Sequence, residues 1–399
     1  MKRSMPRRRR YDQALSIAEL AEIARRRLPN FVYEYIHGGA DDEVSLRNNR
    51  AVFNRYRFTP KTLTDVSQRD LGRDLLGHRV SMPVVIGPTG FNGMITQDGD
   101  SKLARAAADR GIPFTLSNAS TEPLEEIAKV PGGWPWMQIY FYRDHDYVKN
   151  LVDRCRASGY DTIVVTTDSA IYGNREWDTR NYARPFVLNW RNKLHVLSRP
   201  GWMKDVLYPH GVPTFKNLGD LLPPEDSSVQ GAAAEIGKHL MPSLNWEDIR
   251  WLRDNWSGNL LIKGILSVEE ARTAVEYGID GIVLSNHGGR QLDSSVSPME
   301  ILPEVRAAVG DALTILLDGG FRRGSDILKA VLLGADAVLL GRTTLYGLGA
   351  GGQAGVEHAL GLLHKEMDRT LGLLGCSNLQ ELDRSLIRDT CAPQTVSPA

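Results

Sequence analysis

The sequence predicts an α/β fold, a single (β/α)8 TIM barrel, from three observations. Eight short apolar runs follow residue 80, at Pro83–Pro88, Pro113–Ser117, Trp136–Tyr140, Thr162–Asp168, Leu260–Gly264, Gly281–Asn286, Thr314–Gly320 and Ala337–Arg342. Helical patterns, such as Asp100–Arg110 and Ser267–Tyr277, lie between most of these runs. A count of eight favours closure into a barrel over a doubly wound open sheet, which usually has fewer strands. The barrel core is therefore expected over about residues 80–345 of one domain that occupies the whole chain.

A helical extension is expected before the barrel. Ser16 and Glu19 have the spacing of a capping box, so a first helix begins at Ser16. A second helical pattern covers Phe31–Ile36 and ends at a pair of glycines. Residues 1–10 include six Lys or Arg side chains and are predicted to form a disordered basic arm, with contact to an anionic membrane surface as the alternative.

A long insert follows the fourth predicted strand. About 90 residues separate it from the fifth, far more than an ordinary crossover needs. The insert, over about residues 184–242, mixes aromatic side chains such as Trp190 and Trp202 with basic ones such as Arg191 and Lys204. It is interpreted as a lid over the barrel mouth, an oligomer contact or an amphipathic membrane contact, and composition favours the first two.

Charge and cysteine content narrow the class of protein. The chain has 48 Lys and Arg and 48 Asp and Glu, so nothing favours nucleic acid as a partner. Its three cysteines are scattered without metal-ligand spacing, which predicts a reducing compartment, no disulfide framework and no metal site. No apolar run approaches the roughly 20 residues needed to cross a bilayer. A cytoplasmic protein is expected.

The strand ends carry the candidate chemistry, because active sites of such barrels lie at the carboxyl ends of the strands. After the sixth strand, His287 offers a base that titrates near neutral pH, and Arg290 offers a carboxylate binder. A capping histidine and a surface arginine are the structural alternative. However, all eight strand ends are polar or unusual, at Pro88-Thr89-Gly90, Ser117, Gln138 and Tyr140, Thr166 and Asp168, Lys263, Ser285, Asp318-Gly319-Gly320 with Arg322, and Gly341-Arg342. Their convergence on one rim favours an active site.

Two of these ends suggest a cofactor. Gly319 and Gly320 allow backbone N–H groups to approach a phosphate, and Arg322 and Arg342 supply positive charge, although turn glycines with solvated arginines are the alternative. Lys263 could form a Schiff base or act as a fixed cation beside a cofactor that becomes anionic. Polar strand ends suit a heteroaromatic ring with many hydrogen-bonding edges, which favours the fixed cation.

Together these motifs resemble the family of FMN-dependent L-2-hydroxy-acid oxidases and dehydrogenases over nearly the whole chain. Ser285–Asp293 and Asp318–Arg323 carry the most specific likeness. Within the family, Gly87–Gly93 and Gly320–Asp326 are most similar to the mandelate dehydrogenases, with the bacterial L-lactate dehydrogenases next. The resemblance implies an FMN cofactor and the oxidation of an L-2-hydroxy acid to the 2-oxo acid.

The resemblance also implies residue roles. His287 is the expected catalytic base, and Asp168 orients it and favours its charged form. Tyr140 and Lys263 complete the catalytic set, with Lys263 balancing charge on the reduced flavin. The substrate would be bound by Tyr35, Tyr140, Arg175, His287 and Arg290. FMN would be bound by Pro88, Thr89, Gly90, Ser117, Gln138, Thr166, Lys263, Ser285, Asp318, Gly319, Gly320, Arg322, Gly341 and Arg342.

Substrate and partners follow as expectations from the same resemblance. An aromatic acid of the mandelate type is favoured and L-lactate comes next, with electrons passed to a quinone-type acceptor. Gly90 stands where the oxidases typically carry alanine, so an oxidase that releases hydrogen peroxide is the second candidate. A Schiff-base lyase that uses Lys263 and a non-catalytic flavin-binding protein are the remaining alternatives. The resemblance suggests a homotetramer. It also makes a membrane contact through Trp190–Tyr208 as well supported as a lid or an oligomer contact, and such a contact would place the enzyme on the inner face of the cell membrane.

Overall fold

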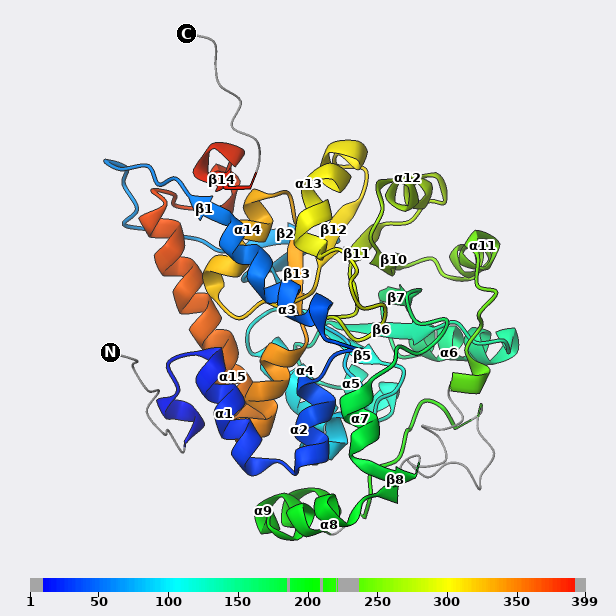
Figure 1. Cartoon of the computed structure of the whole chain (residues 1–399). Coiled ribbons are helices and arrows are strands. Elements are labelled where there is room, and N and C mark those ends of the chain that lie inside the picture. Colours follow the sequence, from blue (N-terminus) through cyan, green and yellow to red (C-terminus); the bar gives the residue numbers. More distant parts are fainter. Residues whose placement is uncertain (1–9, 185–186, 209–210, 220, 222–236, 392–399) are drawn as a thin grey trace.

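A closed barrel of eight parallel strands forms the centre of the molecule (Figure 1). The computed structural model describes residues 10–184, 187–208, 211–219, 221 and 237–391, so nearly all of the predicted basic arm lies outside the described residues. In chain order the strands are β4 (Val84–Ile86), β5 (Phe114–Ser117), β6 (Pro135–Tyr140), β7 (Thr162–Thr166), β10 (Asn259–Ile265), β11 (Gly281–Leu284), β12 (Thr314–Leu317) and β13 (Ala337–Leu340). The predicted (β/α)8 fold is confirmed.

Each barrel strand is followed by a helix of the outer ring, as parallel neighbours require. These helices are α4 (Gly99–Ala108), α5 (Leu124–Ala128), α6 (His145–Ala157), α11 (Trp246–Asn255), α12 (Val268–Glu276), α13 (Pro298–Val309), α14 (Gly324–Leu332) and α15 (Arg342–Leu373). The last is kinked at Gly351 and Gly352.

The N-terminal extension is helical, as predicted. Helix α1 (Ile17–Arg27) begins where the Ser16 side chain accepts the backbone N–H of Glu19 at 3.3 Å. Helices α2 (Asn30–His37) and α3 (Val44–Ala51) follow, and α1 lies along α15 (Figure 1). The short strands β1 (Tyr56–Phe58) and β14 (Ile387–Asp389) pair near the two ends of the described chain.

Strand periodicity explains where the site forms. An inner cluster of apolar side chains fills the barrel and is closed below by the hairpin of β2 (Arg73–Leu75) and β3 (His78–Val80). It includes Val85, Trp136, Val164, Leu261, Val283, Leu316 and Leu339. Because side chains alternate along a strand, residues two positions later face the same interior, nearer the carboxyl ends. They are Gly87, Gln138, Thr166, Lys263, Ser285, Asp318 and Gly341. Gly87 and Gly341 have no side chain, and the other five, with Ser117 of β5, make a polar layer above an apolar core.

The segment between β7 and α11 contains α7 (Glu176–Arg180), β8 (Tyr182–Arg184), β9 (Val187–Leu188), α8 (Trp190–Leu197), α9 (Pro200–Trp202) and a π-helical turn over Met203–Leu207. The Trp202 indole Nε1 donates to the carbonyl of Met94 at 2.8 Å, and its ring meets Phe31 edge-on. Helices α8 and α9 project beyond α2, on the side of the molecule away from α12 and α13 (Figure 1). Among the described residues, no helix has both the length and the apolar character needed to cross a membrane.

Candidate active site

His287 and Asp168 face each other across the barrel mouth. His287 Nδ1 lies 2.9 Å from Asp168 Oδ1, and the backbone N–H of His287 donates to Ser285 Oγ at 2.9 Å. His287 has a left-handed backbone with φ of 56°, which non-glycine residues rarely adopt. Gly264 permits the approach of Asp168, because a Cβ at Gly264 would lie 2.8 Å from Asp168 Cβ. Strain held in place beside an imidazole–carboxylate pair is typical of a functional site.

The two partners of this pair have shifted pKa values. Burial lowers the pKa of His287 below its ordinary value; Asp168 opposes this shift, whereas Lys263 adds to it. Burial alone would raise the pKa of Asp168, but the charges of His287 and Lys263 and two hydrogen bonds hold it well below its usual range. The Asp168 coupling acts in the expected direction, toward the charged imidazole, but burial outweighs it and the net pKa of His287 is lowered. A neutral imidazole beside a carboxylate can accept a proton at neutral pH.

Lys263 is buried within hydrogen-bond reach of two other members of the polar layer. Its Nζ donates to Ser285 Oγ at 2.8 Å and lies 3.2 Å from Asp318 Oδ2. Burial alone would lower the pKa of Lys263, but the Asp318 and Asp168 carboxylates raise it above the ordinary value. A lysine held protonated is a fixed cation and a poor Schiff-base nucleophile.

Two arginines lie beside the imidazole. Arg290 donates to the carbonyl of Gly38 at 2.8 Å, and its guanidinium stacks over Tyr35 at 5.1 Å. Arg175 donates to the carbonyl of Arg290 at 3.1 Å and to Gln291 at 3.0 Å. Burial, with the neighbouring Arg175, lowers the pKa of Arg290. This concentration of buried positive charge is suited to binding a carboxylate.

The predicted phosphate region also comes together. Gly319 and Gly320 have φ of 101° and 81°, and a Cβ at Gly320 would overlap the backbone of Asn49, so only glycine fits there. Arg342, in the first turn of α15, donates to the carbonyls of Ile36, Gly288 and Gly38 at 2.8–2.9 Å. Burial and the Arg290 charge lower the pKa of Arg342 to about 9, while burial lowers that of Arg322. Buried guanidinium groups at a helix N-terminus form a site for an anion.

The remaining predicted residues lie at the ends of β4, β5 and β6. Ser117 Oγ donates to Gln138 Oε1 at 3.1 Å, and the Tyr35 hydroxyl donates to the carbonyl of Gly90 at 3.4 Å. Burial raises the pKa values of Tyr35 and Tyr140, so both phenols remain neutral donors at physiological pH. Thr166 is buried in β7, whereas Pro88, Thr89 and Gly341 are partly exposed at the rim.

The polar layer fits FMN on chemical grounds. Gln138 Nε2 and the second oxygens of Asp168 and Asp318 are buried without a hydrogen-bond partner among the described residues. Buried polar atoms are normally satisfied, so the layer calls for a ligand that both donates and accepts. The edges of an isoalloxazine ring and a ribityl chain do both, and the glycine and arginine groups after β12 and β13 suit the phosphate.

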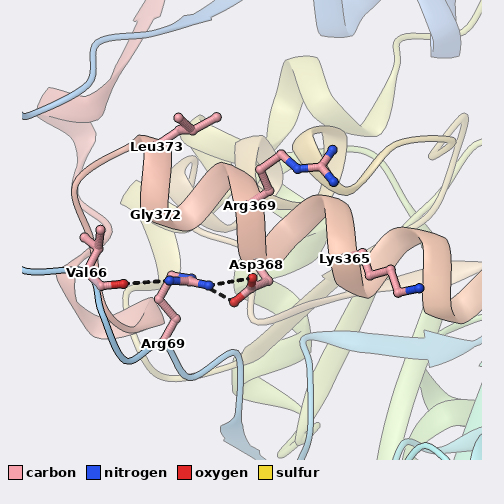
Figure 2. Close-up of a pocket in the computed structure, with 7 residues that line it drawn as sticks. All are labelled: Val66, Arg69, Lys365, Asp368, Arg369, Gly372 and Leu373. Atoms are coloured by element: carbon pink, nitrogen blue, oxygen red, sulfur yellow. Dashed lines mark hydrogen bonds and ion pairs between the residues drawn. The ribbon is translucent and has the colours of Figure 1, made fainter.

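Outside the barrel mouth, the described residues offer little for a metal or a second ligand. Among the described residues, no group of three or more His, Cys, Asp and Glu side chains could hold a metal ion. A surface groove on the second half of α15 is lined by Val66, Arg69, Lys365, Asp368, Arg369, Gly372 and Leu373 (Figure 2). In this groove Arg69 is already paired with Asp368, and the lining shares no residue with the barrel mouth.

Comparison with known proteins identifies the family. The profile of the FMN-dependent dehydrogenase family matches residues 24–389. The chain belongs to this family. It is 44% identical over 375 residues to (S)-mandelate dehydrogenase from Pseudomonas putida, with 94% of each chain covered. It is 39% identical to an L-lactate oxidase from Nostoc sp., covering 94% of this chain and 98% of the relative. The crystal structure of the monotopic membrane protein (S)-mandelate dehydrogenase superposes with a TM-score of 0.90 at 43% identity, covering 94% of this chain and all of that one. The enzyme is therefore an FMN-dependent oxidoreductase that acts on a CH–OH group.

Sequence reasoning missed some residues that build the site. Asp178 pairs with Arg290 at 3.3 Å, and Gln291 donates to the carbonyls of Asp168 and Ile171 at 2.9 Å. Asn49 and Asn286 exchange amide hydrogen bonds at 2.8 and 3.0 Å. Asn286 and Gln291 lie within Ser285–Asp293, the most specific motif, so the sequence could have indicated them. Asn49 and Asp178 lie outside every motif, so the sequence gives no indication of their role.

Proposed function

We propose that the enzyme oxidises an L-2-hydroxy acid of the mandelate type to the 2-oxo acid and passes the electrons to a quinone-type acceptor. The observation that carries this proposal is the His287–Asp168 pair, 2.9 Å apart, together with the nearby side chains of Arg290, which is 13% exposed, and of Arg175, which is partly exposed. A neutral base beside a carboxylate-binding cluster is what proton removal from a 2-hydroxy acid requires.

The residues act as follows. Arg175 and Arg290 bind the substrate carboxylate, and Tyr35 and Tyr140 donate hydrogen bonds to the bound acid. His287 Nε2 accepts a proton, either from the α-carbon or from the hydroxyl group, while Asp168 holds Nδ1 and stabilises the positive charge. In both routes the substrate gives up two electrons.

FMN supplies the two-electron acceptor when it is bound. Gln138, Ser117, Thr166 and the 88–90 segment would hold its ring, while Asp318 and the glycine and arginine groups would hold its ribityl phosphate. Lys263, kept protonated by Asp318, provides positive charge at the reduced cofactor. The same protonation argues against a Schiff-base lyase, and the His287, Arg175 and Arg290 set argues against a purely flavin-binding role.

An aromatic side chain on the substrate is supported by the aromatic surroundings. The Tyr35 ring meets Phe91 edge-on at 5.6 Å, and Phe91 meets Phe215 at 4.3 Å. Aromatic groups favour such edge-to-face contacts with one another. Gly90 has no side chain, and a Cβ there would lie 3.2 Å from Ala119 and 3.5 Å from the Tyr35 hydroxyl.

Anaerobic titration tests the substrate assignment. The FMN-loaded enzyme is mixed with (S)-mandelate and, in separate samples, L-lactate, and the flavin absorbance is followed. We expect (S)-mandelate to bleach the flavin with the higher kcat/KM. Faster bleaching by L-lactate would overturn the substrate class, and rapid recolouring on admission of air would favour the oxidase instead of the dehydrogenase.

A membrane contact through α8 accounts for the quinone acceptor. Trp190, Leu194 and Leu197 lie at helical spacing on one face of α8 and are 57–66% exposed, and Arg191 and Lys193 are exposed beside them. An apolar face flanked by basic residues is the pattern of a helix that lies in an anionic bilayer surface. The monotopic character of the mandelate dehydrogenase structure supports the same assignment.

Vesicle co-sedimentation tests this contact. Wild-type enzyme is expected to pellet with anionic lipid vesicles, and Trp190→Ser with Leu194→Ser should weaken binding at least tenfold. Leu373→Ser, which removes an exposed leucine from the surface groove on α15, serves as the control and should bind like wild type (Figure 2). Equal binding by all three proteins would exclude α8 as the contact.

A homotetramer is proposed as the assembly, and light scattering of the detergent-free protein would measure its mass.

A further inference from the structure

The loop between β4 and α4 has a strained conformation next to the candidate site. Phe91 has φ of 60°, in the left-handed region that bulky residues seldom adopt. The loop lies close to the loop after β5: the backbone N–H of Phe91 donates to the carbonyl of Ala119 at 3.1 Å. A Cβ at Gly90 would be 3.2 Å from both Cβ and carbonyl oxygen of Ala119. Such strain persists only where the surrounding structure holds it.

One buried carboxylate, that of Asp100 in the first turn of α4, holds this loop. Asp100 Oδ1 accepts from Asn92 Nδ2 at 2.7 Å, and Oδ2 accepts from the backbone N–H and hydroxyl of Thr121 at 3.2 Å. Asn92 in turn donates to the carbonyl of Thr89 at 2.9 Å and accepts from its hydroxyl at 3.1 Å. The Thr121 hydroxyl accepts the backbone N–H of Gly93 at 3.0 Å. The residues on both sides of Phe91 are therefore connected to the Asp100 carboxylate.

A carboxyl group satisfies this arrangement, and an amide does not. Asn92 and Thr121 both donate to Asp100, so an amide in its place would turn a donor toward one of them in either orientation. The N-terminus of α4 favours negative charge. Burial raises the pKa of Asp100 to about 7, and Glu122 after β5 adds to the rise, while the hydrogen bonds of Asn92 and Thr121 oppose it. The Asp100 charge also raises the pKa of Tyr35 on α2.

We propose that Asp100 is a positioning residue for the oxidation, which holds Thr89–Gly93 against Ala119 and so sets the width of the pocket beside Gly90. The effect reaches the substrate because the Tyr35 hydroxyl donates to the carbonyl of Gly90. This inference rests on the proposed function, in which Gly90 adjoins FMN and Tyr35 binds the acid.

Asp100→Asn and a matched control, Asp98→Asn, test the proposal. Asp98 is exposed at the same end of α4 and its side chain makes no capping bond, so the control removes the same charge without touching the hydrogen bonds that hold Thr89–Gly93. Asp100→Asn should shift the absorbance maximum of bound FMN and slow the limiting rate of reduction about tenfold, with KM changed less than threefold. Asp98→Asn should leave the spectrum and both constants unchanged. Equal behaviour of the two variants would overturn the proposal.

A double-mutant cycle with Gly90→Ala separates positioning from a general loss of structure. The added methyl group meets Ala119 at 3.2 Å, so Gly90→Ala alone should slow reduction about tenfold. In the Asp100→Asn background the loop can yield, and the same substitution should cost less than threefold. Effects that simply multiply, or a Gly90→Ala change without effect in either background, would contradict the assignment.

The role of Asp100 can be tested even if Asp100→Asn does not fold or if the proposed substrate is wrong. If Asp100→Asn does not fold, Thr121→Val removes one hydroxyl of the network with little change in shape and should shift the FMN spectrum in the same direction. If the wild-type enzyme binds FMN but no 2-hydroxy acid reduces it, the proposed function fails. The FMN spectrum and dissociation constant of the variants still decide the role of Asp100, because neither measurement needs substrate.

Discussion

Replacement of Lys263 by methionine should make stability strongly dependent on pH. Lys263 Nζ lies 3.2 Å from Asp318 Oδ2, and both side chains are buried or nearly so. Without the cation, Asp318 must either stay charged or take up a proton. Protonating a carboxyl group with an ordinary pKa near 3.9 costs about 4 kcal/mol at pH 7 and about 1.5 kcal/mol at pH 5. The value at pH 7 agrees with the loss of about 3–5 kcal/mol that removal of one partner from a buried pair typically causes.

Urea unfolding of FMN-loaded protein at the two pH values measures this difference. Lys263→Met should lose about 4 kcal/mol at pH 7 and less than half of that at pH 5. Lys365→Met, which removes an exposed lysine from α15, should lose little at either pH (Figure 2). If Lys263→Met lost the same free energy at both pH values, uncompensated charge on Asp318 would not be the cause, and the ion pair would have no part in holding the polar layer.

Two further predictions concern the substrate side of the site. Because burial lowers the pKa of His287, kcat/KM in steady-state pH profiles should rise with pH and level off with an apparent pKa below 6.5. Asp168→Asn removes a charge that raises the pKa of His287, so this variant should have a still lower midpoint. A midpoint above 7 in the wild type would contradict the burial argument. Arg290→Lys keeps the charge but cannot contact Gly38 and Asp178 at once, so kcat/KM should fall about tenfold or more, mainly through KM; an unchanged KM would remove Arg290 from the substrate site.

The polar layer could be predicted from the sequence because it follows from strand periodicity. Gln138, Lys263 and Ser285 each stand two residues after an apolar residue of the barrel interior, within runs that read plainly as strands. The predicted runs nevertheless extended beyond the strands: Thr314–Gly320 contains β12, which ends at Leu317. The polar and glycine residues at the ends of these runs belong to the loops, where the site forms.

Contacts between distant segments could not be predicted in the same way. Asn49 of α3 meets Asn286, and Asp178 of α7 meets Arg290, so each contact depends on how a helix outside the barrel packs against the loop after β11. The net lowering of the His287 pKa could not be predicted either, because the sequence identifies its charged neighbour but not the extent of its burial. The role of Asp100 depends on two loops that approach each other, which no spacing in the chain reveals.

The most direct test of the account is the anaerobic reduction of bound FMN by (S)-mandelate in wild-type enzyme and His287→Ala, followed by rapid mixing. We expect both proteins to bind FMN and the wild type to bleach. The variant should be slower by a factor of about a thousand or more, since it lacks the base beside Asp168. A variant that kept more than about a tenth of the wild-type rate would show that His287 is not the base.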